Sequence, residues 1–259
     1  MKLKNYVVMA AALVLSPLVF ATGVHAAAEK HGHEAHWGYE GKAGPMVWGD
    51  LKSEFATCKT GKTQSPIDIQ SGKATKAAAD TLDINYSAST LKVLNNGHTI
   101  QVNYEPGSSV TIDGKKYDLL QFHFHTPSEY TVDGKAYPLE AHFVHKNAEG
   151  QLAVIGVFFK EGKKNDLIQS IWDNLPAEEN KEKVTESVKI NAKDTMPGDQ
   201  SHFHFAGSLT TPPCSEGVNW MVMASPMEAS ADQIKKFQSI VKMNARPIQA
   251  HNDRKIEKH

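Results

Sequence analysis

The segment QFHFHTPSEY at residues 121–130 carries two histidines at a spacing that could bind a metal ion. Side chains alternate between the two faces of a β-strand, so His123 and His125 would share one face. A second segment, LEAHFVH at residues 139–145, would place His142 beside this pair if the two strands paired antiparallel. Three neutral imidazoles with a fourth position open to water form a catalytic zinc site, so the pattern predicts metal chemistry.

The spacing alone does not choose among the histidine pairs of this chain, which contains 13 histidines. His202 and His204 repeat the spacing in SHFHF, and His31 and His33 form a third pair near the N-terminus. Such a pair on a strand is more often exposed or hydrogen-bonded than bound to a metal. The local pattern therefore leaves all three pairs open.

Two polar side chains flank the first group of histidines on the same strand face. Gln121 lies two residues before His123, and Glu140 lies two residues before His142. Amide and carboxylate oxygens commonly accept the second N–H of a metal-binding imidazole and orient its ring. We therefore expect Gln121 and Glu140 to orient the ligands.

The elements that must position these residues are mainly strands. Apolar side chains recur at every second residue over 82–86 and 98–104, which is the period of a strand with one buried face. Residues 152–159 form a continuous apolar run, which indicates a strand buried on both faces. The pairs Asp113-Gly114 and Asp133-Gly134 are typical of hairpin turns between such strands.

Helices are expected in only two places. Asn165 can cap a helix that carries an apolar stripe from Leu167 to Leu175, and Ser230 with Gln233 forms a capping box ahead of a second apolar stripe. No repeat and no linker divides the chain. Many strands with few helices predict one large, mainly antiparallel β domain.

The N-terminal 28 residues have the features of an export signal. Lys2 and Lys4 precede an apolar stretch at residues 7–20, and small residues follow it, so we expect cleavage after residue 26 or 28. The apolar stretch is short for a membrane-spanning helix, and Pro17 interrupts it. This predicts a signal peptide at residues 1–26, an exported protein, most simply in a bacterial periplasm, and no membrane attachment after cleavage.

The charge balance argues against nucleic acid as a partner. The chain has 259 residues, with 28 basic and 29 acidic side chains, and the basic residues form no cluster of the kind that binds phosphate backbones. The composition is that of a folded protein with a sizeable core. Either a monomer or a homodimer is compatible with these properties.

Cys58 and Cys214 are the only two cysteines. In an oxidising compartment they can form a disulfide, and closing so long a loop would stabilise the fold by about 5 kcal/mol. Two buried free thiols are the alternative. A metal site is disfavoured because neither cysteine has a second one at close spacing.

Seven segments of the chain follow one another in the order that one known family shows: HWGY (36–39), QSPIDI (64–69), NNGH (95–98), QFHFHTPSEY (121–130), EAHFVH (140–145), LAVIGVFF (152–159) and GSLTTPPCSEGVNW (207–220). On these segments the chain from His36 to Arg246 resembles the α-class carbonic anhydrases, in particular exported bacterial members. The resemblance implies a mainly β (α+β) catalytic domain over residues 27–259, with a large twisted, mostly antiparallel central sheet, short peripheral helices and a Cys58–Cys214 disulfide.

The resemblance also implies roles for individual residues. His123, His125 and His142 become the ligands of one Zn²⁺, with Gln121 and Glu140 as their hydrogen-bond partners. Thr210 becomes the hydroxyl that orients the attacking oxygen, Glu129 its carboxylate partner, and His98 the proton shuttle. The remaining matches are an apolar substrate pocket (Val144, Val154, Leu209, Thr211 and Trp220) and a water network (Asn96 and Gln101).

The function implied by the resemblance is the reversible hydration of carbon dioxide to bicarbonate and a proton. The attack would come from zinc-bound hydroxide, with a histidine exporting the proton. One alternative is a catalytically silent module of the same fold, which would be expected to have lost a ligand. Another is a periplasmic zinc-binding protein that uses His31, His33 and His36. His202 and His204 match no ligand position and are interpreted as structural.

Overall fold

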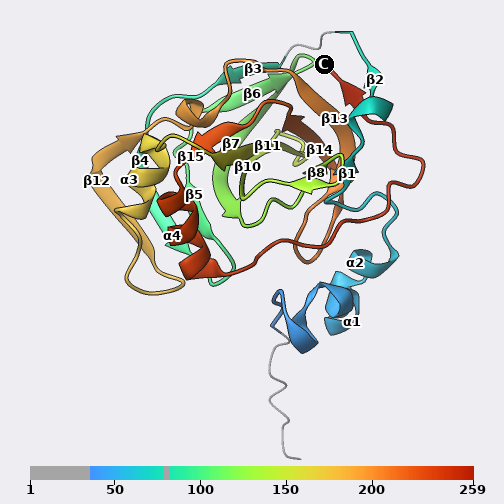
Figure 1. Cartoon of the computed structure of the whole chain (residues 1–259), viewed down its shortest axis with the longest axis horizontal. Coiled ribbons are helices and arrows are strands. Elements are labelled where there is room, and N and C mark those ends of the chain that lie inside the picture. Colours follow the sequence, from blue (N-terminus) through green and yellow to red (C-terminus); the bar gives the residue numbers. More distant parts are fainter. Residues whose placement is uncertain (1–35, 79–81) are drawn as a thin grey trace, which may run out of the picture. The chain divides into compact units, whose positions relative to one another are not determined.

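A large β-sheet dominates the computed structural model, which describes residues 36–78 and 82–259 (Figure 1). Within these residues, thirteen strands form the sheet, whose main path runs β12-β4-β5-β7-β10-β11-β14-β13-β16-β2. Most pairs are antiparallel, as expected, but β11 with β14, β11 with β15, and β16 with β2 are parallel. The sheet is therefore mixed. The expected signal peptide lies outside the described residues.

The strands are β1 Asp68–Ile69, β2 Thr75–Lys76, β3 Leu82–Asn85, β4 Ser89–Asn95, β5 Ile100–Asn103, β6 Ser109–Ile112, β7 Lys115–His125, β8 Thr131–Val132, β9 Lys135–Ala136, β10 Leu139–Lys146, β11 Leu152–Glu161, β12 Glu182–Ile190, β13 His202–Ser208, β14 Glu216–Met223, β15 Met227–Ala229 and β16 Glu257–Lys258. The α-helices are α1 Trp48–Leu51, α2 Thr57–Thr60, α3 Asp166–Trp172 and α4 Ala231–Val241. Short 3₁₀ turns cover Gly41–Ala43, Pro45–Val47, Ser53–Phe55, Ser71–Lys73 and Ala192–Thr195.

The two longer helices begin where the sequence predicts. Asn165 accepts a hydrogen bond from the backbone N–H of Ile168 at the start of α3, and Ser230 and Gln233 form both bonds of a capping box on α4. The helices pack together through the stacked rings of Trp172 and Phe237. Within the described residues, no helix has the length and apolar content needed to cross a membrane.

The strands that carry the predicted ligands lie in the middle of the sheet. β10 pairs antiparallel with β7 on one side and with β11 on the other, and His142 lies directly opposite His123. The apolar run predicted to be buried on both faces forms β11, in which residues 153–159 are buried. Both predicted hairpin turns are present, with Asp113 and Asp133 at positive φ ahead of their glycines. The central strands therefore hold the ligands on a rigid, buried support.

The segment before the first strand forms only short helices and 3₁₀ turns, and it is anchored to the rest of the domain. Trp48 is fully buried and packs in a small apolar cluster that includes Phe55 and the cysteines. Cys58 and Cys214 are joined as a disulfide, which confirms the predicted pairing. This bond ties the segment to the loop between β13 and β14.

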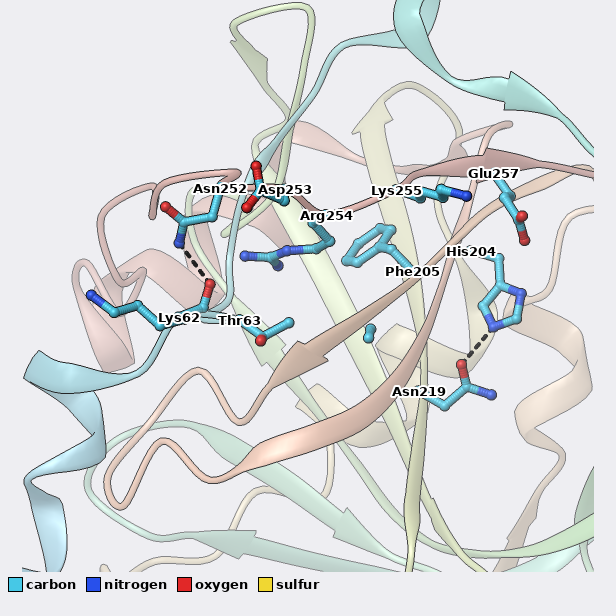
Figure 2. A pocket seen from close by; sticks show the side chains of 11 residues that line it. Lys62, Thr63, His204, Phe205, Asn219, Asn252, Asp253, Arg254, Lys255 and Glu257 are labelled. Carbon is cyan, nitrogen blue, oxygen red and sulfur yellow. Dashed lines mark hydrogen bonds between the residues drawn. The ribbon is translucent and has the colours of Figure 1, made fainter.

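A cavity of about 590 Å³ lies beside β13 and β14 (Figure 2). Its lining includes Lys62, His204, Asn219, Arg254 and Glu257. It contains none of the residues that the sequence assigns to catalysis or zinc binding. The cavity is therefore separate from the predicted active site.

Candidate metal centre

Three histidines from two neighbouring strands converge in the structure as the sequence predicts. β7 carries His123 and His125, and β10 carries His142. One ring nitrogen from each lies within 4.8 Å of the others, so the three could hold a metal ion. The alternation of side chains along β7 puts both of its histidines on one face, and the antiparallel register brings the third to them.

The first two imidazoles are held by oxygen acceptors. Nδ1 of His123 lies 2.9 Å from Oε1 of Gln121, and Nδ1 of His125 lies 2.8 Å from the backbone oxygen of Asn244. Since these oxygens only accept, each Nδ1 carries the proton and donates it. The lone pair of each ring is then on Nε2, which is the nitrogen available to a metal.

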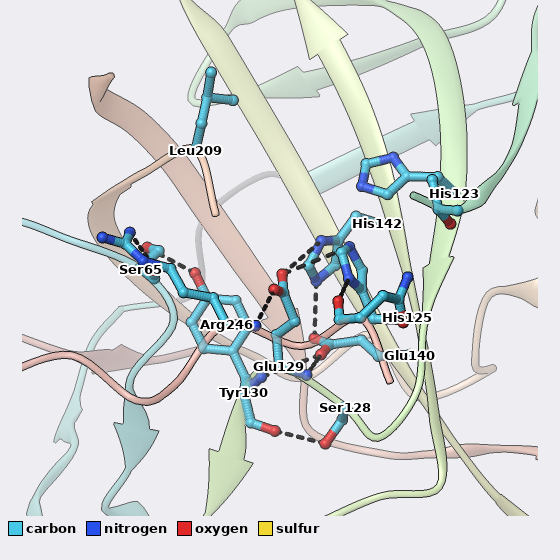
Figure 3. Close-up of polar contacts among 12 residues, drawn as sticks. Ser65, His123, His125, Ser128, Glu129, Tyr130, Glu140, His142, Leu209 and Arg246 are labelled. Atoms are coloured by element: carbon cyan, nitrogen blue, oxygen red, sulfur yellow. Dashed lines mark hydrogen bonds and ion pairs between the residues drawn. The ribbon is translucent and has the colours of Figure 1, made fainter. Parts of the chain in front are cut away.

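His142 is oriented the other way round. Oε1 of Glu140 lies 3.2 Å from Nε2 of His142, a contact outside hydrogen-bond geometry, while Oε2 of Glu140 accepts the backbone N–H groups of Glu129 and Tyr130 (Figure 3). This leaves Nδ1 as the metal-facing nitrogen of His142. Gly156 lies next to the carboxylate, since an added Cβ would come within 3.2 Å of Oε1.

Burial makes the three imidazoles neutral at pH 7. Removal from water lowers the pKa of His125 to about 4 and that of His142 to about 3, and it holds the pKa of His123 well below its ordinary value. The opposing influence of Glu129, which raises the pKa of His125, does not overcome this. Neutral imidazoles are the form that binds metal, so no proton has to leave before binding.

Glu129 lies next to the histidines and contacts Thr210, another of the predicted catalytic residues. Its Oε2 is 3.5 Å from Nε2 of His125, and its Oε1 accepts the backbone N–H of Arg246 at 2.9 Å. Burial raises the pKa of Glu129, while a hydrogen bond from the side chain of Thr210 opposes this rise. The structure therefore pairs Thr210 with Glu129, as expected from the sequence.

The residues expected to form an apolar pocket belong to one cluster. Val144 lies opposite Val154, and Val154 lies opposite Trp220, on three adjacent strands. Leu209 packs against the same cluster. The ring of Trp220 stands edge-on to His142, with centroids 4.9 Å apart. An apolar surface thus reaches the ligand group, and Thr211 follows Thr210 in the loop after β13.

His98 is half-buried and is covered by aromatic rings. The ring of Trp37 stacks on it with centroids 3.8 Å apart, and the His36 ring lies 5.0 Å away. Partial burial, with a smaller contribution from His36, lowers the pKa of His98 below its ordinary value. The pKa of His98 therefore lies below that of a free imidazole, and the ring remains partly accessible to solvent.

Asn96 and Gln101 are engaged with neighbouring groups. Oδ1 of Asn96 accepts the backbone N–H groups of His98 and Thr99, and Nε2 of Gln101 donates to Oδ1 of Asn103 at 2.7 Å. Asn96 thus shapes the turn that presents His98. The expected role of both side chains in ordering water stays a prediction.

Two residues that support the site were missed by the sequence analysis. Asn244 holds His125 through its carbonyl, and its amide donates to the backbone oxygens of His98 and Phe124. Arg246 binds Glu129 through its backbone and reaches the carbonyl of Cys58 with its guanidinium. Both lie more than 100 residues from their partners, and no local pattern marks them.

The comparisons with known proteins agree with this geometry. The model of the eukaryotic-type carbonic anhydrase family matches residues 43–259. A carbonic anhydrase of Nostoc sp. is 46% identical over 224 residues, which cover 85% of each chain.

Two solved structures resemble the chain along almost their whole length. A hyperthermostable carbonic anhydrase identified from an active hydrothermal vent chimney is 52% identical, with a TM-score of 0.83, over 86% of this chain and 99% of that one. The α-carbonic anhydrase of Thermovibrio ammonificans, in complex with sulfanilamide, is 46% identical, with a TM-score of 0.84 and the same coverage. The chain belongs to the eukaryotic-type, or α, carbonic anhydrase family.

Proposed function

We propose that the chain catalyses the reversible hydration of carbon dioxide to bicarbonate and a proton, with one zinc ion held by His123, His125 and His142. The observation that carries this proposal is the orientation of the three imidazoles. Each has one nitrogen facing an oxygen acceptor, so the other nitrogen presents its lone pair to a common point. Three neutral imidazoles are the donor set of a catalytic zinc site.

The buried atoms of the site fit a bound cation. Nε2 of His125 faces the point where the three imidazoles converge; it is buried and has no hydrogen-bond partner among the described residues. Buried polar atoms are normally satisfied, so an ion at this position accounts for it. When bound, zinc would lower the pKa of a coordinated water to about 7, a value for which carbonic anhydrases as a class are the known example.

Thr210 and Glu129 would set the direction of attack. The hydroxyl of Thr210 donates to the Glu129 carboxylate, so its oxygen offers only lone pairs to the reacting group. The oxygen of Thr210 would accept a hydrogen bond from the O–H of the attacking group and so turn a lone pair of that group towards the carbon. This is a positioning effect, and it requires that Glu129 stay ionised.

The apolar cluster suits the substrate and disfavours the product. Carbon dioxide is uncharged, so it can lie against Val144, Val154, Leu209 and Trp220 without losing hydrogen bonds to water. Bicarbonate is an anion that such a surface binds poorly. Thr211 would lie beside the substrate and contact its oxygen.

His98 would carry the released proton to buffer. An imidazole accepts and releases protons near neutral pH, and the half-buried position of His98 gives it access to both protein and solvent. Asn96 and Gln101 would help to order the water that links His98 to the reaction centre. The stacked ring of Trp37 holds the imidazole in one orientation.

We infer that the protein is exported and that residues 1–26 are removed. The disulfide between Cys58 and Cys214 supports an oxidising compartment, which for a bacterial protein is the periplasm. The Nostoc relative supports a bacterial type of enzyme. The mature chain would act as a monomer or a homodimer.

The test is stopped-flow hydration of carbon dioxide by the purified mature protein, before and after removal of zinc by a chelator. We expect rapid hydration that is lost with zinc and restored when one equivalent is returned. A silent binding module would show no hydration activity either before or after zinc is returned. A zinc-storage protein would no longer bind zinc when His31, His33 and His36 were replaced. The proposed enzyme would keep the one zinc ion per chain that its activity requires.

A further inference from the structure

A second group of metal-binding side chains lies at the far edge of the sheet. β13 pairs antiparallel with β16, and His204 lies opposite Glu257. His202 and His259 continue the ladder by exchanging backbone hydrogen bonds of 3.2 and 3.0 Å. Since side chains at every second position share a face, His202, His204, Glu257 and His259 lie on one face of this strand pair.

The rings of His204 and His259 are oriented as in the first metal centre. Nε2 of His204 lies 2.5 Å from Oδ1 of Asn219, and Nδ1 of His259 lies 2.8 Å from the backbone oxygen of Ala78. Both partners are acceptors, so these two nitrogens carry protons. The lone pairs are then on Nδ1 of His204 and Nε2 of His259.

A carboxylate completes the group. Oε2 of Glu257 is 3.9 Å from Nε2 of His259, and one ligand atom from each of His204, Glu257 and His259 lies within 4.8 Å of the others. Ligand atoms around a tetrahedral zinc ion are about 3.3 Å apart for bonds of about 2.0 Å, so the longest of these separations must shorten by up to about 1.5 Å. The Glu257 side chain is 46% exposed and can make this adjustment by rotation.

We propose that His204, Glu257 and His259 form a second site for a divalent transition metal, with zinc as the suited ion. Two imidazoles and one carboxylate are a known zinc-binding set that leaves one position for water. That position would face the 590 Å³ cavity lined by His204 and Glu257 (Figure 2). This proposal gives His204 a metal-binding role, whereas the sequence analysis interpreted it as structural.

The second site should bind more weakly than the first. Arg254 and Lys255 line the same cavity, and their positive charges oppose a bound cation. Solvent also reaches the Glu257 carboxylate, whereas the first site is buried. The two sites should therefore fill one after the other as zinc is added.

A metal at this site would link β13 to the C-terminal strand β16, two parts of the chain that are distant in sequence. β16 has only two residues, and it joins β13 to β2 at the edge of the sheet. A ligand that binds the folded chain and not the unfolded chain stabilises the fold by an amount that grows with the logarithm of the ligand concentration above the dissociation constant. Zinc at the second site should therefore raise the thermal midpoint even when the first site cannot bind.

The test uses the untagged full chain with His142→Ala, which removes the first site. Zinc binding is measured by equilibrium dialysis with metal analysis, and the thermal midpoint is recorded at increasing zinc concentration. We expect one remaining equivalent and a rise of the midpoint. Adding Glu257→Gln should weaken this binding at least about tenfold and remove the rise, since one of three ligands is lost.

The matched control is Asp253→Asn, which removes a carboxylate from the same cavity but not from the ligand group. In the His142→Ala chain, Asp253→Asn should leave the one remaining zinc ion bound. The proposal is overturned if the His142→Ala chain retains no zinc, or if Glu257→Gln leaves the binding unchanged. It is also overturned if the equivalent disappears on replacing His31 and His33 instead. In the unaltered chain the expected count is two equivalents, the second weaker, which provides an independent check that does not depend on the folding of a variant.

Discussion

The two histidine groups of this protein share one strand pattern and differ in their surroundings. In the central group, His123 and His125 on β7 face His142 on β10, and the side chain of His142 is almost completely buried. At the edge of the sheet, His204 on β13 faces Glu257 on β16, which is half exposed. Both groups combine two side chains two residues apart with one from an antiparallel neighbour: His123 and His125 with His142 in the centre, Glu257 and His259 with His204 at the edge.

The comparison shows what burial adds to a ligand pattern. In the central group, loss of water lowers the pKa of the imidazoles, so they are neutral and ready to bind. The same burial places an apolar cluster and the Thr210–Glu129 pair around the group. The edge group has no such surroundings among the described residues, so its geometry supports metal binding and not catalysis. A ligand set alone therefore does not make an active site.

The largest effect should follow from removing a central ligand. His142→Ala should lose the tightly bound zinc and reduce carbon dioxide hydration to the background rate, because two imidazoles cannot hold the ion in place. Metal analysis and stopped-flow hydration measure this together. His251→Ala removes an imidazole outside both groups and should keep zinc and activity. Full zinc content and full rate in the His142→Ala chain would refute the ligand assignment.

The disulfide supports the central group and not the edge group. Cys214 lies in the loop that carries Thr210, and the carbonyl of Cys58 accepts from Arg246, so the bond anchors the surroundings of the central group. Replacing both cysteines by serine should lower the free energy of unfolding by about 2–5 kcal/mol. Urea unfolding measures this, and the unaltered chain in reducing buffer serves as the control. Two thiols open to alkylation in the folded, oxidised chain would contradict the assignment.

Proton transfer through His98 is a function that we expect of the central group alone. His98→Ala should reduce turnover in weak buffer by about 10²-fold, the lower end of the usual range for a proton-transfer residue, and leave the zinc content unchanged. Added imidazole should restore the rate, because it replaces the lost base. His251→Ala tests for a general effect of losing an imidazole. Unchanged turnover in weak buffer, or no response to imidazole, would remove this role from His98.

The smallest effects should come from the amides that orient one histidine in each group. Oε1 of Gln121 faces His123, and Oδ1 of Asn219 faces His204. Gln121→Ala should weaken zinc binding at the central group about 10–100-fold, and Asn219→Ala should do the same at the edge group. Each variant is the control for the other, measured by competition with a chelator. Equal loss at both groups from either variant would show a general effect on the fold.

Much of the fold follows from local patterns. The two-residue period predicted the strands around Ile84 and Val102, and the caps at Asn165 and Ser230 predicted the starts of α3 and α4. These signals are local because alternation and capping involve residues only a few positions apart. The parallel pairing of β11 with β14 had no such signal, since it joins strands about 65 residues apart.

The sequence by itself determined which residue types could hold a metal, that two of them share a strand face, and that the segments resemble α-class carbonic anhydrases. Spacing could not distinguish the pair His123 and His125 from His202 and His204, because both have the same local pattern. Only the tertiary structure decided that the first pair is buried beside His142, and that the second faces Glu257 instead. It also decided that Asn244 holds a ligand. The physical reason is that burial, and contacts such as that of Asn244 with His125 across 119 residues, arise from the packing of the whole sheet and not from neighbouring residues in the sequence.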